Sequence, residues 1–176
     1  MILSGLPGSG KTHAAQMLVG EGWEGISAGN LIRKLCLKEG LGIDRETLQE
    51  FGKSLLQSKG EAFFSKLLIA EAGGKNQVVF EGIRPLRVIS EIKKRNMYCI
   101  HIYIESKEKN RLARLKNRDG LSIEQFRKLA ENPLEIQVTA QKELADEIVF
   151  NNQTIELFDK SMREVSVMAI RKCHQC

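Results

Sequence analysis

Residues 5–12, Gly-Leu-Pro-Gly-Ser-Gly-Lys-Thr, constrain the fold of this chain more than any other segment. They match the pattern G-x-x-x-x-G-K-S/T, follow the apolar run at 1–4 and precede a helix-compatible run at 11–19. Glycine permits backbone angles that a side chain forbids, so successive N–H groups can turn inward and form an anion nest at the positive end of a helix. The segment therefore predicts a phosphate-binding loop between a buried strand and a helix.

The last residues of the loop indicate which phosphate compound it binds. Lys11 supplies a mobile cation for β- and γ-phosphates, and the Thr12 hydroxyl is placed to bind Mg²⁺, so we expect ATP and Mg²⁺ as cofactors. His13 follows the loop, where we expect a solvated or core histidine rather than a catalytic one. The residues expected to border the cofactor in this segment are Gly5, Gly8, Ser9, Gly10, Lys11, Thr12 and His13.

Apolar runs alternate with helical periodicity along the chain, which is typical of a parallel sheet covered by helices. Strands are expected at 1–4, 23–26, 77–80, 98–104 and 147–150. Helices are expected at 11–19, 30–38, 45–58, 61–72, 86–95, 107–117, 122–130, 133–145 and 154–170. The sequence thus predicts an α/β fold: a three-layer α/β/α P-loop NTPase domain with a five-stranded parallel sheet, over residues 1–176.

Size and composition fit a single domain. The chain has 176 residues, of which 42% are hydrophobic, enough for one buried core and too few residues for two domains of ordinary size. There is no run of about 18 apolar residues, and residues 1–20 lack the pattern of an export signal, so a soluble protein without membrane contact is expected. The net charge of +5 favours anionic ligands without choosing among nucleotides, other phosphates and nucleic acid.

The four cysteines are Cys36, Cys99, Cys173 and Cys176, too scattered for the disulfide framework of a small secreted domain. A reducing cytoplasm is therefore the expected compartment. The last two lie three chain positions apart with a histidine between them, but structural zinc needs four ligands and no second pair lies nearby. We expect residues 171–176 to be an inert tail.

Two classes of nucleotide-binding protein are set aside. GTPases read guanine through an Asn-Lys-x-Asp loop, which this chain lacks. AAA-type ATPases need a larger core and a separate helical lid domain. The remaining residues instead indicate a small kinase.

The segment at 26–33, Ile-Ser-Ala-Gly-Asn-Leu-Ile-Arg, resembles the Ile-Ser-Thr-Gly-Asp-Leu-Leu-Arg segment of the nucleoside monophosphate kinases, the adenylate kinase family. In that family the segment holds the acceptor nucleotide and its arginine grips the acceptor phosphate. The resemblance implies that Ser27, Gly29 and Arg33 bind the substrate. The chain departs from the family at Ala28 and Asn30, which leaves the acceptor base open, and Arg33 as a plain surface residue is the alternative.

A second segment, Val-Val-Phe-Glu-Gly-Ile-Arg-Pro at 78–85, resembles the family's buried strand that ends in Asp-Gly-Phe-Pro-Arg. An acidic residue at such a strand end can orient water bound to Mg²⁺, so Glu81 is expected to serve the metal and the substrate side. Arg84 would be a second ligand of the acceptor phosphate and a catalytic residue. The alternative for Glu81 is an ordinary ion pair with a neighbouring base.

Arg111, Arg114 and Arg118 recur at i, i+3 and i+7 and share one stripe of a helix that we do not expect to face the core. The spacing of Arg114 and Arg118 is similar to the family's Arg-x-x-x-Arg entry to the lid, where one arginine lies against the donor adenine and the other contacts the transferring phosphates. Both are therefore counted as catalytic, and Arg114 also as cofactor-binding. Arg111 could equally belong to a solvated face, and Arg127 is a weaker lid candidate.

Residues 145–158 resemble the final strand and following helix of dephospho-coenzyme A kinases and of archaeal adenylate-kinase-like proteins. In these proteins the loop after the strand borders the donor adenine. The resemblance implies that Asn151, or else Asn152, contacts the base, although asparagine pairs are also common in turns.

Together these features predict an ATP-dependent phosphotransferase whose acceptor is nucleotide-like, with a nucleoside or deoxynucleoside monophosphate as the first choice. Residues 28–72 are expected to form a helical acceptor-binding insertion, and 118–131 a lid over the donor. Dephospho-coenzyme A or another hydroxyl acceptor is the alternative, and a non-catalytic ATP-binding switch is a further one. Nucleic acid is not expected as a partner, because aromatic residues make up only 6% of the chain. The oligomeric state stays open.

Overall fold

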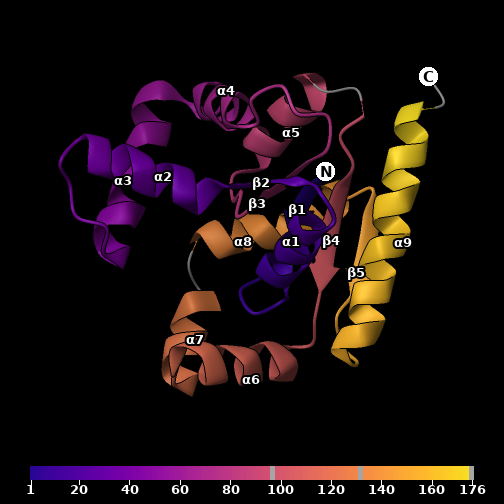
Figure 1. Ribbon diagram of the computed structural model, residues 1–176. Coiled ribbons are helices and arrows are strands. Elements are labelled where there is room, and N and C mark those ends of the chain that lie inside the picture. Colours follow the sequence, from indigo (N-terminus) through magenta and orange to yellow (C-terminus); the bar gives the residue numbers. More distant parts are fainter. Residues whose placement is uncertain (96–97, 131–132, 175–176) are drawn as a thin grey trace.

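The computed structural model describes residues 1–95, 98–130 and 133–174 as strands, helices and loops (Figure 1). The strands are β1 (Ile2–Ser4), β2 (Glu24–Ser27), β3 (Val78–Glu81), β4 (His101–Glu105) and β5 (Glu147–Phe150). The helices are α1 (Lys11–Gly20), α2 (Ala28–Lys38), α3 (Arg45–Lys59), α4 (Glu61–Glu71), α5 (Leu86–Arg95), α6 (Glu108–Asp119), α7 (Ile123–Ala130), α8 (Pro133–Ala140), the short 3₁₀ helix η1 (Gln141–Leu144) and α9 (Ile155–His174).

All five strands are parallel and lie in the order β2-β3-β1-β4-β5, so the predicted five-stranded parallel sheet is confirmed. Side chains of β1 alternate between the two faces, as in any strand. Leu3 belongs to a buried cluster with α1 and α9, whereas Ile2 belongs to another with α2, α4 and α5. Because both faces are covered, the strands read as continuous apolar runs.

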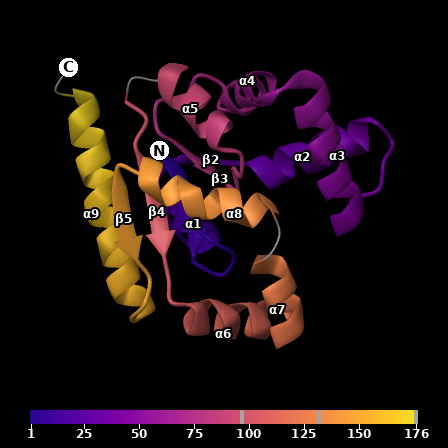
Figure 2. The same cartoon turned by 180° about the vertical axis from the view of Figure 1, so that it is seen from behind.

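The layers can be followed in Figures 1 and 2, which view the molecule from opposite sides. Helix α1 lies in front of the sheet in Figure 1, and α8 lies in front of it in Figure 2. Helices α2 and α3 stand at one side of the molecule, and α6 and α7 run along its lower edge. The expected lid at 118–131 comprises the end of α6, Gly120 and α7, with residue 131 outside the described residues.

Strand β1 marks the point where the chain reverses its direction of travel across the sheet. From β1 the chain crosses to β2 beyond β3, and from β3 it crosses back to β4 on the other side of β1. In open parallel sheets, ligands bind outside the carboxyl ends of the strands at such a point. The phosphate loop follows β1 and Glu81 ends β3, so the topology brings both to the same crevice.

Three elements differ from the prediction by three residues or more. Strand β4 begins at His101 rather than at 98, because its neighbour β1 begins at Ile2, which pairs with His101. The helix predicted at 133–145 divides into α8 and η1 at Gln141, whose side-chain amide bonds the backbone of another loop. Helix α9 continues to His174, so most of the expected inert tail is helical, and residues 175–176 lie outside the described residues.

Among the described residues, none of the helices combines the length and the apolar character that crossing a membrane requires.

The buried side chain of His101, in β4, contacts one residue of β1 and one of η1. His101 Nε2 lies 2.6 Å from Ser4 Oγ, and Nδ1 lies 3.2 Å from the carbonyl oxygen of Leu144. A carbonyl can only accept, so Nδ1 carries the proton and Nε2 accepts from the Ser4 hydroxyl. Burial lowers the pKa of His101 and keeps the ring neutral.

This burial predicts an acid-sensitive stability. An unfolded histidine titrates near pH 6.5, above the lowered folded pKa, so stability is fully present above about pH 6.5 and falls as the pH decreases below it, by up to about 1.4 kcal/mol per pH unit. Urea unfolding between about pH 7 and pH 5 measures the slope. His101→Gln should flatten the slope; an equal slope in His101→Gln and in the parent protein would contradict the assignment.

Candidate functional site

The phosphate loop has the conformation that its glycines predict. Gly5, Gly8 and Gly10 have φ angles of 137°, 78° and 111°, in the region that side chains disfavour. Lys11 Nζ folds over the loop and donates to the carbonyl oxygens of Gly5 at 2.7 Å and Leu6 at 3.0 Å. Burial lowers the pKa of Lys11 to about 8, and the nearby Glu135 carboxylate opposes that shift.

The outer side of the loop is held by side chains from distant elements. Asn151 Nδ2 donates to the Ser9 carbonyl at 2.8 Å, Arg114 Nη1 to the Gly8 carbonyl at 3.1 Å, and Arg111 Nη1 to the Pro7 carbonyl at 3.4 Å. The Ser9 N–H donates to the Leu6 carbonyl within the loop. Because the other carbonyls are bonded from outside, the remaining N–H groups of the loop are left for a ligand on the inside.

Thr12 and Glu81 lie together, as expected of a metal site at the end of β3. Thr12 Oγ1 donates to Glu81 Oε2 at 3.1 Å. No group of three or more Asp, Glu, His or Cys side chains that could hold a metal occurs among the described residues. Mg²⁺ commonly takes one or two protein oxygens and completes its shell with water and substrate phosphates, so this oxygen pair beside the loop fits Mg²⁺.

A cavity of about 780 Å³ lies over the loop. It is lined by the phosphate loop with Lys11 and Thr12, by the strand end at 81–84, by Arg114 and Arg118 of α6, and by Glu135 and Val138 of α8. This volume is in the range of small-ligand sites. The cavity therefore brings together the predicted catalytic residues Lys11, Arg84, Arg114 and Arg118.

The predicted acceptor segment is not part of this cavity lining. Ser27 caps α2, its Oγ accepting from the Asn30 N–H at 3.4 Å. The exposed Arg33 donates to Asn30 Oδ1 at 2.7 Å, a contact within one helical turn. Ser27, Gly29 and Arg33 are absent from the cavity lining, although Gly29 lies beside Gly82, which belongs to it.

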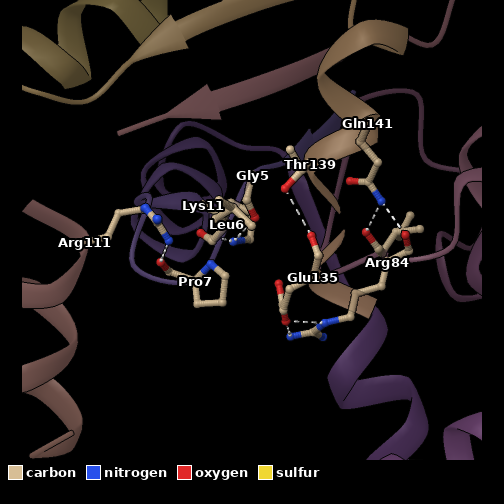
Figure 3. A network of polar contacts seen from close by, with 10 residues as sticks. Gly5, Leu6, Pro7, Lys11, Arg84, Arg111, Glu135, Thr139 and Gln141 are labelled. Atoms are coloured by element: carbon tan, nitrogen blue, oxygen red, sulfur yellow. Dashed lines mark hydrogen bonds and ion pairs between the residues drawn. The ribbon is translucent and has the colours of Figure 1, made fainter. Parts of the chain in front are cut away.

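Arg84 is paired with a residue that the sequence did not single out. Its Nε and Nη2 both lie 2.9 Å from Glu135 Oε1 (Figure 3). The Glu135 side chain is buried, whereas that of Arg84 is 45% exposed. A signal was present, because Glu135 lies one turn before the buried Val138, on the core-facing side of α8, where unpaired carboxylates are rare.

The arginine stripe of α6 divides into three different environments. Arg111 is buried, so the expectation that the stripe avoids the core is wrong for this residue. Its guanidinium lies 5.3 Å from the centre of the Phe126 ring, which explains how the charge tolerates burial. Arg118 is exposed and pairs with Asp119. Arg127, the weaker candidate, is exposed on α7.

Arg114 and Asn151 form one network behind the loop. Arg114 donates to Ser106 Oγ and to both oxygens of Asn151, each at 3.0 Å. The side chain of Asn151 thus bonds Arg114 through its oxygen and the loop through its nitrogen. Its contacts within the protein are those of a residue that holds the loop. His13, by contrast, is exposed, and its Nε2 lies 2.7 Å from Asp159 Oδ1.

Known proteins match this chain along most of its length. A family model described as an AAA domain matches residues 4–125. A "UPF0200 protein" of Sulfurisphaera tokodaii is 32% identical over 167 residues, which are 93% of this chain and 93% of that protein. The structure of TT1252 from Thermus thermophilus has a TM-score of 0.67 at 22% identity, covering 96% of this chain and 95% of that one. Dephospho-CoA kinase from Campylobacter jejuni has a TM-score of 0.59 at 20% identity, covering 98% and 97%.

At these identities the solved structures show the fold alone, which this chain shares with dephospho-CoA kinase, so the predicted resemblance to P-loop kinases is confirmed at the level of the fold. The family description also bears on the exclusion of AAA-type ATPases. That exclusion rested on the larger core and the separate helical lid domain of AAA-type ATPases, and residues 1–95, 98–130 and 133–174 contain one sheet domain without such an addition. The exclusion was too broad, because the AAA domain model matches residues 4–125 of a chain of this size and architecture.

Proposed function

The chain belongs to the AAA domain family and is a relative of the UPF0200 proteins, and on this premise we propose that it is an ATP- and Mg²⁺-dependent phosphotransferase. The γ-phosphoryl group would move to a nucleotide-like small molecule. One observation carries the proposal: a single cavity contains the phosphate loop, the Thr12–Glu81 oxygen pair and Arg84. A donor site and an acceptor site within one cavity are what transfer between two small molecules requires.

On the donor side, the loop N–H groups and Lys11 would hold the β- and γ-phosphates, with Gly5, Gly8, Ser9 and Gly10 shaping the loop. Thr12 and Glu81 would hold Mg²⁺ directly or through water. The ion would neutralise charge on the migrating phosphoryl group. Because little covalent help is needed for this transfer, positioning and charge neutralisation carry the catalysis.

The proposal requires the Arg118 side chain to exchange its present partner for the phosphates. It faces the cavity from the lid, but its fork is bound to Asp119, with Nε and Nη2 each 2.6 Å from a carboxylate oxygen. An exposed ion pair contributes at most about 1 kcal/mol, so phosphates can take Arg118 from Asp119. Arg114 stays behind the loop and supports its shape.

A nucleoside monophosphate is the acceptor that the resemblance of residues 26–33 indicates, with Ser27, Gly29, Arg33 and Arg84 as its ligands. Because the first three lie outside the cavity lining, this acceptor requires α2–α4 to close toward α8. A hydroxyl acceptor is the second candidate, and it requires a base near the γ-phosphate.

The test is a panel of acceptors offered with ATP and Mg²⁺. Nucleoside and deoxynucleoside monophosphates and dephospho-coenzyme A are assayed separately for ADP release and phosphorylated product. At least one acceptor is expected to raise ADP release well above the rate with water alone. If none does, the non-catalytic ATP-binding switch replaces the kinase proposal.

A further inference from the structure

Glu135 is a buried carboxylate in the cavity that the proposed function has not used. The residue is 3% exposed and lines the same cavity as Lys11 and Arg84. Among the charged groups that influence Lys11, Glu135 has the largest effect, ahead of Arg84 and Glu81. In the view of Figure 3, the Arg84–Glu135 pair lies to one side of the phosphate loop and Arg111 to the other.

Glu135 is held in place where α8 and η1 meet the loop that follows β3. Gln141, the first residue after α8, donates from Nε2 to the carbonyl oxygens of Ile83 at 3.0 Å and Arg84 at 2.6 Å. Arg84 then reaches back to Glu135, and both contacts use the same oxygen, Oε1. The carboxylate is thereby oriented by Arg84, which does not use the second oxygen, Oε2.

The charges around Arg84 and Glu135 favour an acceptor atom without charge over an acceptor phosphate. Arg84 is the cation there, and Glu135 already neutralises it. Glu81 adds a second carboxylate, and Arg33, the other predicted phosphate ligand, is absent from the lining. The other cations of the lining, Lys11, Arg114 and Arg118, border the phosphate loop or belong to α6, where the donor phosphates are expected. An acceptor phosphate would therefore find beside Glu135 only an arginine that is already paired, whereas a neutral hydroxyl group needs no cation there.

We propose that Glu135 is the general base for a hydroxyl acceptor in this cavity, an inference that rests on the phosphotransferase function proposed above. The acceptor oxygen forms a bond to the γ-phosphorus while the bond from that phosphorus to the β,γ-bridging oxygen breaks. The bridging oxygen keeps the electron pair and leaves as part of ADP. The hydroxyl proton passes to the Glu135 carboxylate, with Oε2 the oxygen that Arg84 leaves available. The acceptor class is therefore a nucleotide-like molecule that offers a hydroxyl group.

A purely structural role for Glu135 as the counter-ion of Arg84 makes different predictions. A counter-ion affects folding and the shape of the site, whereas a base affects the chemical step. Water is the smallest hydroxyl acceptor, so hydrolysis of ATP without any other acceptor reports on the base even before the natural acceptor is identified.

The experiment compares the whole chain with Glu135→Gln and with Glu143→Gln, which removes the same charge from an exposed position on η1. ATP affinity, thermal stability and the single-turnover rate of Mg²⁺-ATP hydrolysis are measured for each. Glu135→Gln is expected to lower the rate by about 10²-fold or more, with ATP affinity within about threefold of the parent. Glu135→Asp should recover part of the rate, and Glu143→Gln should match the parent.

Four results would overturn the inference. If Glu135→Gln hydrolyses ATP at a rate within about twofold of the parent, Glu135 is not the general base. A rate loss explained by weaker ATP binding or by unfolding assigns Glu135 to structure. Transfer from ATP to the phosphate of a nucleoside monophosphate, undiminished in Glu135→Gln, contradicts the hydroxyl acceptor and leaves the phosphotransferase function standing. If the parent protein neither hydrolyses ATP nor transfers its γ-phosphoryl group, both proposals are wrong.

Discussion

Replacing Lys11 with alanine is expected to lower the rate of γ-phosphoryl transfer by about 10²- to 10³-fold with any acceptor. The ammonium group lies at the centre of the loop, bound to the carbonyl oxygens of Gly5 and Leu6. Both bonds exchange readily for bonds to phosphate oxygens, which carry more charge than a carbonyl. Because the side chain neutralises charge that develops during transfer, its removal affects turnover more than ground-state binding of ATP.

The measurement is kcat with ATP in excess, together with the dissociation constant for ATP. Lys109→Ala removes the same group from an exposed position on α6 and should leave both values unchanged. Equal kcat values for Lys11→Ala and the parent would show that the phosphate loop takes no part in the reaction. A loss confined to ATP affinity would assign Lys11 to binding alone.

Replacing Gly5 with alanine is expected to reduce the free energy of unfolding by about 2–5 kcal/mol. A Cβ atom at this position would lie 2.3 Å from the backbone oxygen of Ile104 and 2.8 Å from Ser9 Oγ. The first contact is with a core strand that cannot move aside. The backbone angle, with φ at +137°, adds conformational strain to the clash.

Gly40→Ala separates these two causes. Gly40 also has a positive φ, +70°, but nothing lies within 4 Å of the position of its Cβ. Its replacement should therefore cost only the conformational term, about 1–2 kcal/mol. Urea unfolding of the two variants measures the difference, and an equal loss in both would show that Ile104 does not restrict the loop.

The fold could be predicted from the sequence because its signals are local. Buried parallel strands are continuous apolar runs, and the loop motif fixes the connection between β1 and α1. The pairing between Thr12 and Glu81 also follows from the pattern, since the carboxyl ends of neighbouring parallel strands meet at one edge. Boundaries were less predictable: β4 starts where its partner β1 starts, which depends on the register between them.

The site was less predictable where it depends on contacts between distant elements. The burial of Arg111 under Phe126 requires α7 to fold back on α6, and no spacing within one helix indicates that. Asn151 holds the loop from a strand end that is 142 positions away from Ser9. Glu135 matches no motif, and its role becomes visible only when α8 packs beside the loop at 82–84.

The central claim is that one cavity holds both the ATP donor and its acceptor. The most direct test uses ATP labelled with radioactive phosphorus at the γ position, mixed with the protein, Mg²⁺ and each acceptor of the panel. The account predicts that the label moves to a hydroxyl group of one acceptor, and that Lys11→Ala and Glu135→Gln each prevent this transfer. Label that appears only as free phosphate at the same slow rate with every acceptor, or that stays on ATP, would contradict it.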